Sequence, residues 1–153
     1  NGSVFYFDLK LKRSAKPEQA APSPLKQLKN KRALLAEDNL INAMVARKLL
    51  SNWGIISEHA KDGLEAIEKS RQQVFDFILM DIHMPEMNGF DAAKNIRELE
   101  NPNMSTPIFA LTADITAEHQ QEYTAYFNGF LRKPIEIEKL YQALLNTLAM
   151  AAV

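Results

Sequence analysis

Five polar side chains with reactive chemistry each follow a short apolar run of the sequence. Glu37 and Asp38 follow the first run, Asp81 follows a later one, and Thr112 and Lys133 follow the last two. Three carboxylates brought together raise one another's pKa unless a cation neutralises them, and an all-oxygen site suits Mg²⁺ or Mn²⁺. We expect Asp81 to attack phosphorus as an oxygen nucleophile, with Lys133 neutralising the transferring group and Thr112 donating a hydrogen bond to it.

The apolar runs alternate with amphipathic stretches, as in β/α units that build a parallel sheet. Ligands of such sheets bind at the carboxyl ends of the strands, so the five side chains are expected to converge there. The predicted strands are 33–36, 55–60, 77–80, 108–111 and 128–131. The predicted helices are 41–53, 63–72, 89–99, 116–125 and 136–149. Asp62, three residues before Glu65, is expected to cap the second helix, and Asn39 to cap the first.

The beginning of the chain has a different composition. Residues 4–11 alternate strictly between two faces, which predicts a strand, and 13–30 form a Pro-containing stretch that favours an interdomain linker. The folded domain is expected at 31–150. Residues 1–31 carry seven Lys or Arg against two acids, and 32–153 carry eleven against seventeen. The scattered positive charges come without a recognition helix, so no binding to nucleic acid is expected.

Composition also limits the location of the protein. No run approaches the roughly 18 apolar residues of a membrane-spanning helix, and the beginning lacks the layout of a signal peptide. The chain has no cysteine, which excludes a disulfide framework and is consistent with a reducing compartment. We therefore expect a cytoplasmic protein whose present chain makes no membrane contact.

Four motifs in a fixed order resemble the receiver domains of two-component signalling, and most closely those attached to hybrid sensor histidine kinases. The resemblance covers 31 to about 148 and is carried by Ala36-Glu37-Asp38-Asn39-Leu40-Ile41-Asn42, Met80-Asp81-Ile82-His83-Met84-Pro85-Glu86-Met87-Asn88-Gly89, Ala110-Leu111-Thr112-Ala113 and Lys133-Pro134. It implies a flavodoxin-like (βα)5 fold, an α/β doubly wound parallel sheet of five strands in the order 2-1-3-4-5.

The resemblance also implies the roles of the acidic residues. Asp81 looks like the residue that is phosphorylated from a phosphohistidine. Asp38 and Asp81 resemble direct ligands of Mg²⁺, while Glu37 acts through water and the backbone carbonyl of His83 completes the protein's share of the coordination. Such a domain catalyses only its own phosphoryl transfer and hydrolysis.

Further roles concern the change of state after transfer. Lys133 looks like the partner of the acyl phosphate, and the bond from Lys133 to Pro134 is expected to be cis. Thr112 and Phe130 match the two switch positions, at which a hydroxyl moves toward the phosphoryl group and an aromatic ring turns inward. The segment from Thr112 to Lys133 is one residue shorter than is typical of receivers in hybrid kinases, and Tyr126 stands where a glycine is usual. A reshaped signalling surface is expected there.

The segment 2–9 resembles, more weakly, the final strand of a histidine-kinase ATP-binding domain. This similarity assigns 1–12 to such a domain and 13–30 to the linker, and it makes the parent protein a hybrid kinase that can be membrane-anchored. The alternative is a tag-derived Gly-Ser followed by an incidental apolar strand. The implied partners are the phosphohistidine domain of a histidine kinase, in cis or in trans, and a histidine phosphotransfer domain.

Two other functions use some of the same residues. Aspartate-nucleophile phosphatases of the haloacid dehalogenase type need a second Asp two positions beyond the nucleophile, and here that residue is His83. A pseudo-receiver that serves only in protein interaction usually lacks the acidic pair, the central Asp or the Lys, and this chain has them all. His59 and His119 are expected to lie far from the acidic cluster.

Overall fold

The computed structural model describes residues 27–113, 121 and 124–151. Its five strands form one parallel sheet in the order β2-β1-β3-β4-β5, so the predicted topology is confirmed. The strands are β1 Arg32–Ala36, β2 Ile56–Ala60, β3 Phe77–Asp81, β4 Ile108–Thr112 and β5 Gly129–Arg132. Every residue of β3 and β4 is buried, because these strands lie inside the sheet with helices on both faces.

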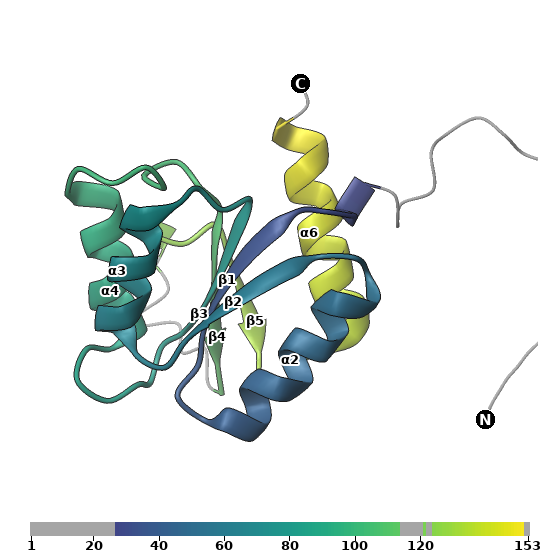
Figure 1. The fold of residues 1–153 in the computed structure, drawn as a ribbon, viewed down its shortest axis with the longest axis horizontal. Helices are drawn as coiled ribbons and strands as arrows, with labels where there is room; N and C mark the ends of the chain where they lie inside the picture. Colours follow the sequence, from purple (N-terminus) through teal and green to yellow (C-terminus); the bar gives the residue numbers. More distant parts are fainter. Residues whose placement is uncertain (1–26, 114–120, 122–123, 152–153) are drawn as a thin grey trace, which may run out of the picture.

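Four described helices cover the sheet in two layers (Figure 1). They are α2 Leu40–Asn52, α3 Gly63–Gln72, α4 Gly89–Glu98 and α6 Ile137–Ala151. Figure 1 shows α3 and α4 on one face and α2 and α6 on the other. No helix in the described part of the chain is both long and apolar enough to cross a membrane.

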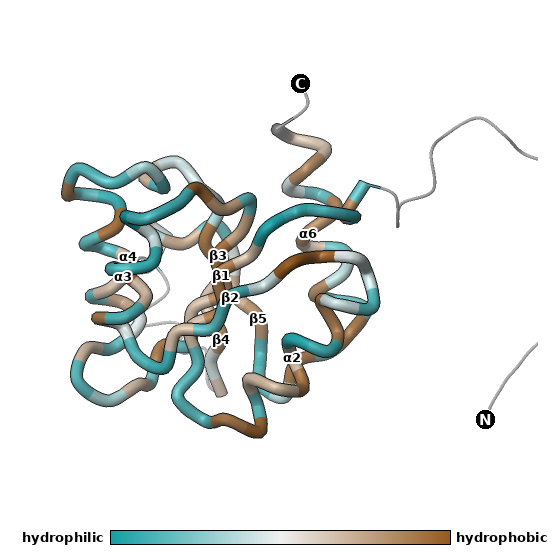
Figure 2. The backbone as a smooth tube through the Cα atoms, viewed as in Figure 1, coloured by the Kyte–Doolittle hydropathy of each residue, from teal (hydrophilic) through white to brown (hydrophobic). Residues whose placement is uncertain are grey.

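The sheet separates two hydrophobic cores. Side chains alternate between the faces of a strand, so Leu34 and Ile78 enter the core beneath α3 and α4, while Leu35 and Leu79 enter the core beneath α2 and α6. The apolar strands therefore appear as a brown centre in Figure 2, with hydrophilic segments around it. Packing on both faces fixes the register of the sheet, and hence the place where each strand ends.

Short polar side chains begin the helices that follow β1, β2 and β3. Asn39 accepts a hydrogen bond from the backbone N–H of Asn42 at 3.0 Å, and Asp62 accepts one from Glu65 at 2.8 Å. The predicted caps are thus confirmed. Asn88 performs the same role for α4. Each cap fixes the start of its helix at the end of a loop that leaves the carboxyl edge of the sheet, which holds these loops in place.

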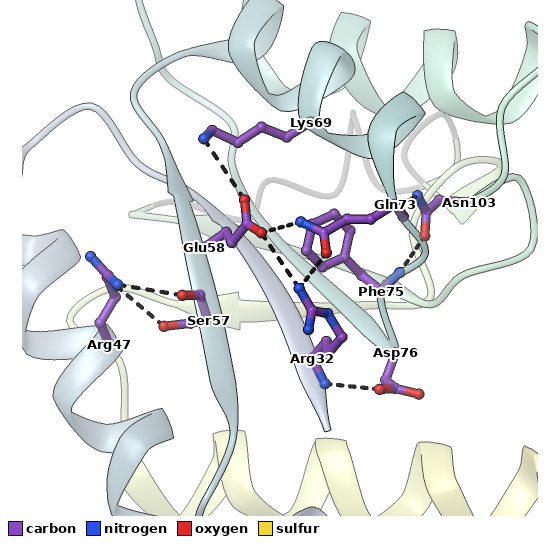
Figure 3. A network of polar contacts seen from close by, with 9 residues as sticks. All are labelled: Arg32, Arg47, Ser57, Glu58, Lys69, Gln73, Phe75, Asp76 and Asn103. Carbon is purple, nitrogen blue, oxygen red and sulfur yellow. Dashed lines mark hydrogen bonds and ion pairs between the residues drawn. The ribbon is translucent and has the colours of Figure 1, made fainter. Parts of the chain in front are cut away.

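A polar network lies at the opposite part of the sheet, where β1 and β3 begin (Figure 3). The guanidinium of Arg32 donates to Gln73 and lies 3.6 Å from the Glu58 carboxylate, which also accepts from Gln73 and lies 3.8 Å from the Lys69 ammonium. The network joins β1, β2, α3 and the chain entering β3. It fastens the edge strand β2, whose own sequence is too polar to be held by burial alone.

The structure differs from the sequence predictions at some boundaries. Strand β5 begins at Gly129, because Asn128 instead exchanges hydrogen bonds with Ile108 through its backbone N–H and its side-chain oxygen. Leu28, within the predicted linker, is completely buried in the core beneath α2 and α6. The predicted strand at 4–11, the linker as far as residue 26 and most of the predicted helix 116–125 lie outside the described residues.

Candidate functional site

The carboxyl ends of β1, β3 and β5 surround one cleft. The cleft has a volume of about 300 Å³ and is lined by Glu37, Asp38, Asn39, Asn42, Asp81, His83, Ala113 and Lys133. The structure thus brings together the acidic pair, the central aspartate and the lysine that stand almost a hundred positions apart in the sequence. Topology is the cause, because parallel strands place all their carboxyl ends on one edge.

Three carboxylates form the floor of this cleft. One oxygen from each of Glu37, Asp38 and Asp81 lies within 4.8 Å of the others. Glu37 and Asp81 are each only 2 % exposed, whereas Asp38 is exposed. A group of hard oxygen donors with one member open to solvent fits Mg²⁺, which keeps several of its own waters when it binds. Among the described residues, this is the one acidic or histidine cluster with the geometry of a metal site.

Lys133 bridges two of the three carboxylates. Its Nζ lies 3.0 Å from Oε2 of Glu37 and 3.1 Å from Oδ2 of Asp81, and both carboxylates are 3 % exposed while the lysine side chain is 21 % exposed. Partial burial by itself lowers the pKa of Lys133, but its hydrogen bonds and Coulombic attraction to Glu37 and Asp81 outweigh that effect, so the pKa is raised. The ammonium is therefore kept charged. The bond from Lys133 to Pro134 is cis, as predicted.

Backbone N–H groups hold the second carboxylate oxygen of Glu37 and of Asp81. The N–H of Asn39 donates to Oε1 of Glu37 at 3.1 Å, and the N–H of His83 donates to Oδ1 of Asp81 at 3.2 Å. Behind Asp81, Gly89 approaches so closely that a Cβ added there would lie 2.0 Å from the Asp81 carbonyl oxygen. A glycine is required at this point because the first turn of α4 packs directly against the end of β3.

Thr112 and Phe130 lie on neighbouring strands behind the cleft. Thr112 ends β4 and is 3 % exposed, and its carbonyl accepts the backbone N–H of Lys133 at 2.9 Å. Phe130 is partly buried against the core beneath α3 and α4, with its ring centroid 6.2 Å from that of Phe127. The backbone bond places the switch candidate Thr112 next to the lysine. In the sheet Thr112 pairs with Arg132, and Phe130 lies two residues before Arg132 on β5.

One sequence expectation about histidine is wrong. His59 was expected far from the acidic cluster, yet its Nε2 lies 2.7 Å from the backbone carbonyl oxygen of Glu37. The reason is the pairing of β2 with β1, which places His59 opposite Leu35, two residues before Glu37. No motif signals such a contact, because its acceptor is a backbone group. His119 lies outside the described residues.

The chain belongs to the response regulator receiver domain family, whose model matches residues 33–145. Among curated proteins it is 35 % identical over 150 residues to the autoinducer 2 sensor kinase/phosphatase LuxQ of Vibrio vulnificus. That match covers 95 % of this chain and 17 % of LuxQ, so the chain spans about a sixth of the length of this relative. A receiver carried within a sensor kinase is the arrangement of a hybrid histidine kinase, and this chain is most like receivers of that type.

Two solved structures show the same architecture. The receiver domain of the sensor histidine kinase PA1611 from Pseudomonas aeruginosa, solved with a magnesium ion in its active-site cleft, is 30 % identical with a TM-score of 0.71. The match covers 78 % of this chain and 98 % of that one. The receiver domain of Ssk1 from Saccharomyces cerevisiae, solved with the histidine phosphotransfer protein Ypd1, is 26 % identical with a TM-score of 0.72, covering 82 % and 93 % of the two chains.

Proposed function

We propose that this receiver accepts a phosphoryl group on Asp81 from a phosphohistidine, with Mg²⁺ bound at the acidic cluster, within a hybrid sensor histidine kinase. One observation carries the proposal: the Lys133 ammonium lies about 3 Å from both Glu37 and Asp81 in an open cleft. The carboxylate of Asp81 provides the nucleophile, and the partly buried ammonium that it shares with Glu37 provides positive charge for a phosphoryl group.

In the proposed transfer an oxygen of Asp81 forms a bond to phosphorus as the bond from phosphorus to the imidazole nitrogen breaks. The electron pair of the broken bond stays on the imidazole, and the product is an acyl phosphate on Asp81. Lys133 is close enough to Asp81 to pair with an oxygen of the transferred group. Its ammonium is already in position before transfer, so little reorganisation is needed.

The carboxylates of Glu37, Asp38 and Asp81, together with the carbonyl of His83, are proposed to hold the metal. Bound Mg²⁺ would supply positive charge that offsets the repulsion between the carboxylates and an incoming phosphoryl group. The donor set of hard oxygens supports this choice, and the magnesium ion in the cleft of the PA1611 receiver agrees with it.

Thr112 and Phe130 are proposed to report the modification. Thr112 is linked through its carbonyl to the backbone of Lys133, and Phe130 lies on the adjoining strand β5. A new charge on Asp81 that attracts the Thr112 hydroxyl would change the packing available to the Phe130 ring. The signal would then leave through the surface around β5.

The phosphodonor is proposed to dock on α2 beside the cleft. Asn39 and Asn42 line the cleft. Three large apolar side chains next to them are exposed: Leu40 is 67 % exposed, Ile41 72 % and Met44 71 %. A phosphohistidine must reach Asp81 through the same opening, so its domain would cover this surface. The kinase's own phosphohistidine domain and a phosphotransfer protein, such as the one bound by Ssk1, are the candidates. Because such a partner is phosphorylated from ATP, we propose that this receiver lies in the cytoplasm.

The test uses the full chain with acetyl phosphate and Mg²⁺, followed by intact-mass measurement. We expect the wild-type chain to gain one phosphoryl group, Asp81→Asn to gain none, and Asp91→Asn to behave as wild type, because Asp91 lies on α4 as a helix-capping partner. Equal labelling of Asp81→Asn would show that Asp81 is not the acceptor. Absence of both labelling and Mg²⁺ binding in the wild-type chain would favour a pseudo-receiver.

A further inference from the structure

His59 contacts the acidic pair through the backbone and not through a carboxylate. Its Nε2 lies 2.7 Å from the carbonyl oxygen of Glu37. Because a carbonyl oxygen only accepts hydrogen bonds, Nε2 carries a proton and donates it. This carbonyl belongs to the peptide group that joins Glu37 to Asp38, and a peptide group is planar. A hydrogen bond that fixes the oxygen therefore fixes the direction in which the chain enters Asp38.

The sheet alone does not hold this peptide group. The pairing of β1 with β2 ends at Ala36 and Ala60, and the N–H of Glu37 makes one more bond, to the carbonyl of Ala60 at 3.0 Å. Strand β2 ends there, and two residues later Asp62 caps α3. The next bond of the ladder, to the Glu37 carbonyl, comes from the His59 ring in place of strand backbone.

We propose that His59 is a positioning residue for the metal-binding carboxylates. With its bond, Glu37 is fixed at both backbone groups by β2 and at both carboxylate oxygens by Asn39 and Lys133. Within the described part of the chain, the His59 bond is the one that acts on the peptide between the two acidic residues, and Asp38 is the exposed member of the cluster. The inference rests on the proposed metal site, whose ligands lie at the ends of β1 and β3, and it adds a residue of β2 to that site.

The neighbouring residue Ser57 offers a matched control. Residues two apart on a strand point to the same face, so Ser57 and His59 share the face of the sheet that α2 covers. Figure 3 shows Ser57 directed to Arg47 of α2. Glu58, which stands between Ser57 and His59 in the sequence, is directed to Lys69 of α3 on the other face. Ser57→Ala therefore changes the same strand and face without touching Glu37.

The experiment measures Mg²⁺ binding to the full chain by titration followed through amide NMR shifts, with urea unfolding recorded in parallel. His59→Phe removes the donor, whereas His59→Gln retains an N–H at a similar reach. We expect His59→Phe to weaken Mg²⁺ binding about 3- to 10-fold, with His59→Gln recovering most of the affinity and Ser57→Ala matching wild type. A purely structural role would lower stability and leave the Mg²⁺ dissociation constant unchanged.

A second measurement needs no metal. In the metal-free chain, the amides of Asp38 and Asn39 should exchange with solvent faster in His59→Phe than in His59→Gln or Ser57→Ala. The peptide group that contains the Asp38 amide, and from which the chain continues to Asn39, is then no longer held. Equal exchange and equal Mg²⁺ affinity in His59→Phe and wild type would overturn the role of His59. A wild-type chain that binds no Mg²⁺ would instead overturn the proposed metal site.

Discussion

Replacing Lys133 by methionine should make the stability of this receiver depend on Mg²⁺. The substitution keeps much of the side chain's apolar length but removes the ammonium that lies 3.0 Å from Glu37 and 3.1 Å from Asp81. Each carboxylate is 3 % exposed, so neither regains full hydration when the ammonium is lost. The variant leaves two buried negative charges beside the exposed charge of Asp38.

The size of the effect follows from these distances. At 3 Å and an effective dielectric constant of about 20, two unit charges attract by about 5.5 kcal/mol. Desolvation cancels most of that gain, and the lysine side chain is 21 % exposed, which weakens it further. We therefore expect Lys133→Met to lower the free energy of unfolding by about 2 kcal/mol in metal-free buffer. Saturating Mg²⁺ supplies the missing charge and should reduce the deficit to about 0.6 kcal/mol.

The smaller loss of unfolding free energy in Mg²⁺ means that the variant binds Mg²⁺ more tightly than wild type does. A change of about 1.4 kcal/mol corresponds to a tenfold ratio of dissociation constants, so the variant should bind Mg²⁺ about ten times more tightly than wild type. The physical reason is that the Lys133 ammonium and the metal ion compete for the same carboxylates.

Urea unfolding in EDTA and in Mg²⁺ measures the four free energies. Trp53, the single tryptophan, reports the transition because its ring packs edge-on against Tyr141 with centroids 5.1 Å apart. Lys139→Met is the control: its ion pair with Glu136 is on the surface, with the lysine 70 % exposed, and should contribute less than about 0.5 kcal/mol. Equal stability of Lys133→Met and wild type in EDTA, or equal stabilisation of both chains by Mg²⁺, would show that Lys133 and the metal ion do not compete for these carboxylates.

Two other substitutions test how helix α4 is held against its neighbours. Gly89→Ala places a Cβ 2.0 Å from the Asp81 carbonyl oxygen; it should cost about 3 kcal/mol of unfolding free energy and weaken Mg²⁺ binding, and a variant as stable as wild type in urea would show that α4 can shift freely. Arg97→Met removes four hydrogen bonds from a guanidinium whose pKa is lowered by burial. The acceptors of these bonds are Tyr126, Asn128, Met104 and Thr106. The free energy of unfolding measured in urea should fall by about 2 to 3 kcal/mol. A loss under about 0.5 kcal/mol would show that these bonds contribute little to stability.

The strands and the convergence of the cleft were predictable because both depend on patterns that sequence displays. An unbroken apolar run such as 77–80 suits a strand covered on both faces, and a polar residue at its end, such as Asp81, then lies at the ligand-binding edge. The topology turns these one-dimensional positions into a cluster. The distances within it, including the bridge from Lys133, needed the structure.

The contacts that the sequence did not predict either have backbone groups as acceptors or involve an apolar residue outside any repeating pattern. His59 stands on the polar edge strand β2 and bonds a carbonyl, so its residue type carries no signal of that partner. Arg97 likewise donates to three backbone carbonyls. Leu28 stands in a Pro-containing stretch with Leu25 as the other large apolar residue near it, and one such pair is too short a pattern to mark it as part of the core.

The place of Lys133 at the end of β5 is set at the beginning of that strand. Asn128 is joined to Ile108 of β4 by two hydrogen bonds, at 2.7 and 2.9 Å, which start the pairing in register. From there the ladder aligns Thr112 with Arg132, and the N–H of Lys133 continues it to the Thr112 carbonyl at 2.9 Å. The pairing from Asn128 onward therefore fixes the place of Lys133 independently of the length of the segment before it. The shorter segment that we expect before Phe130 should then leave the proposed chemistry at Asp81 unaffected, because β4 positions the strand that carries the lysine.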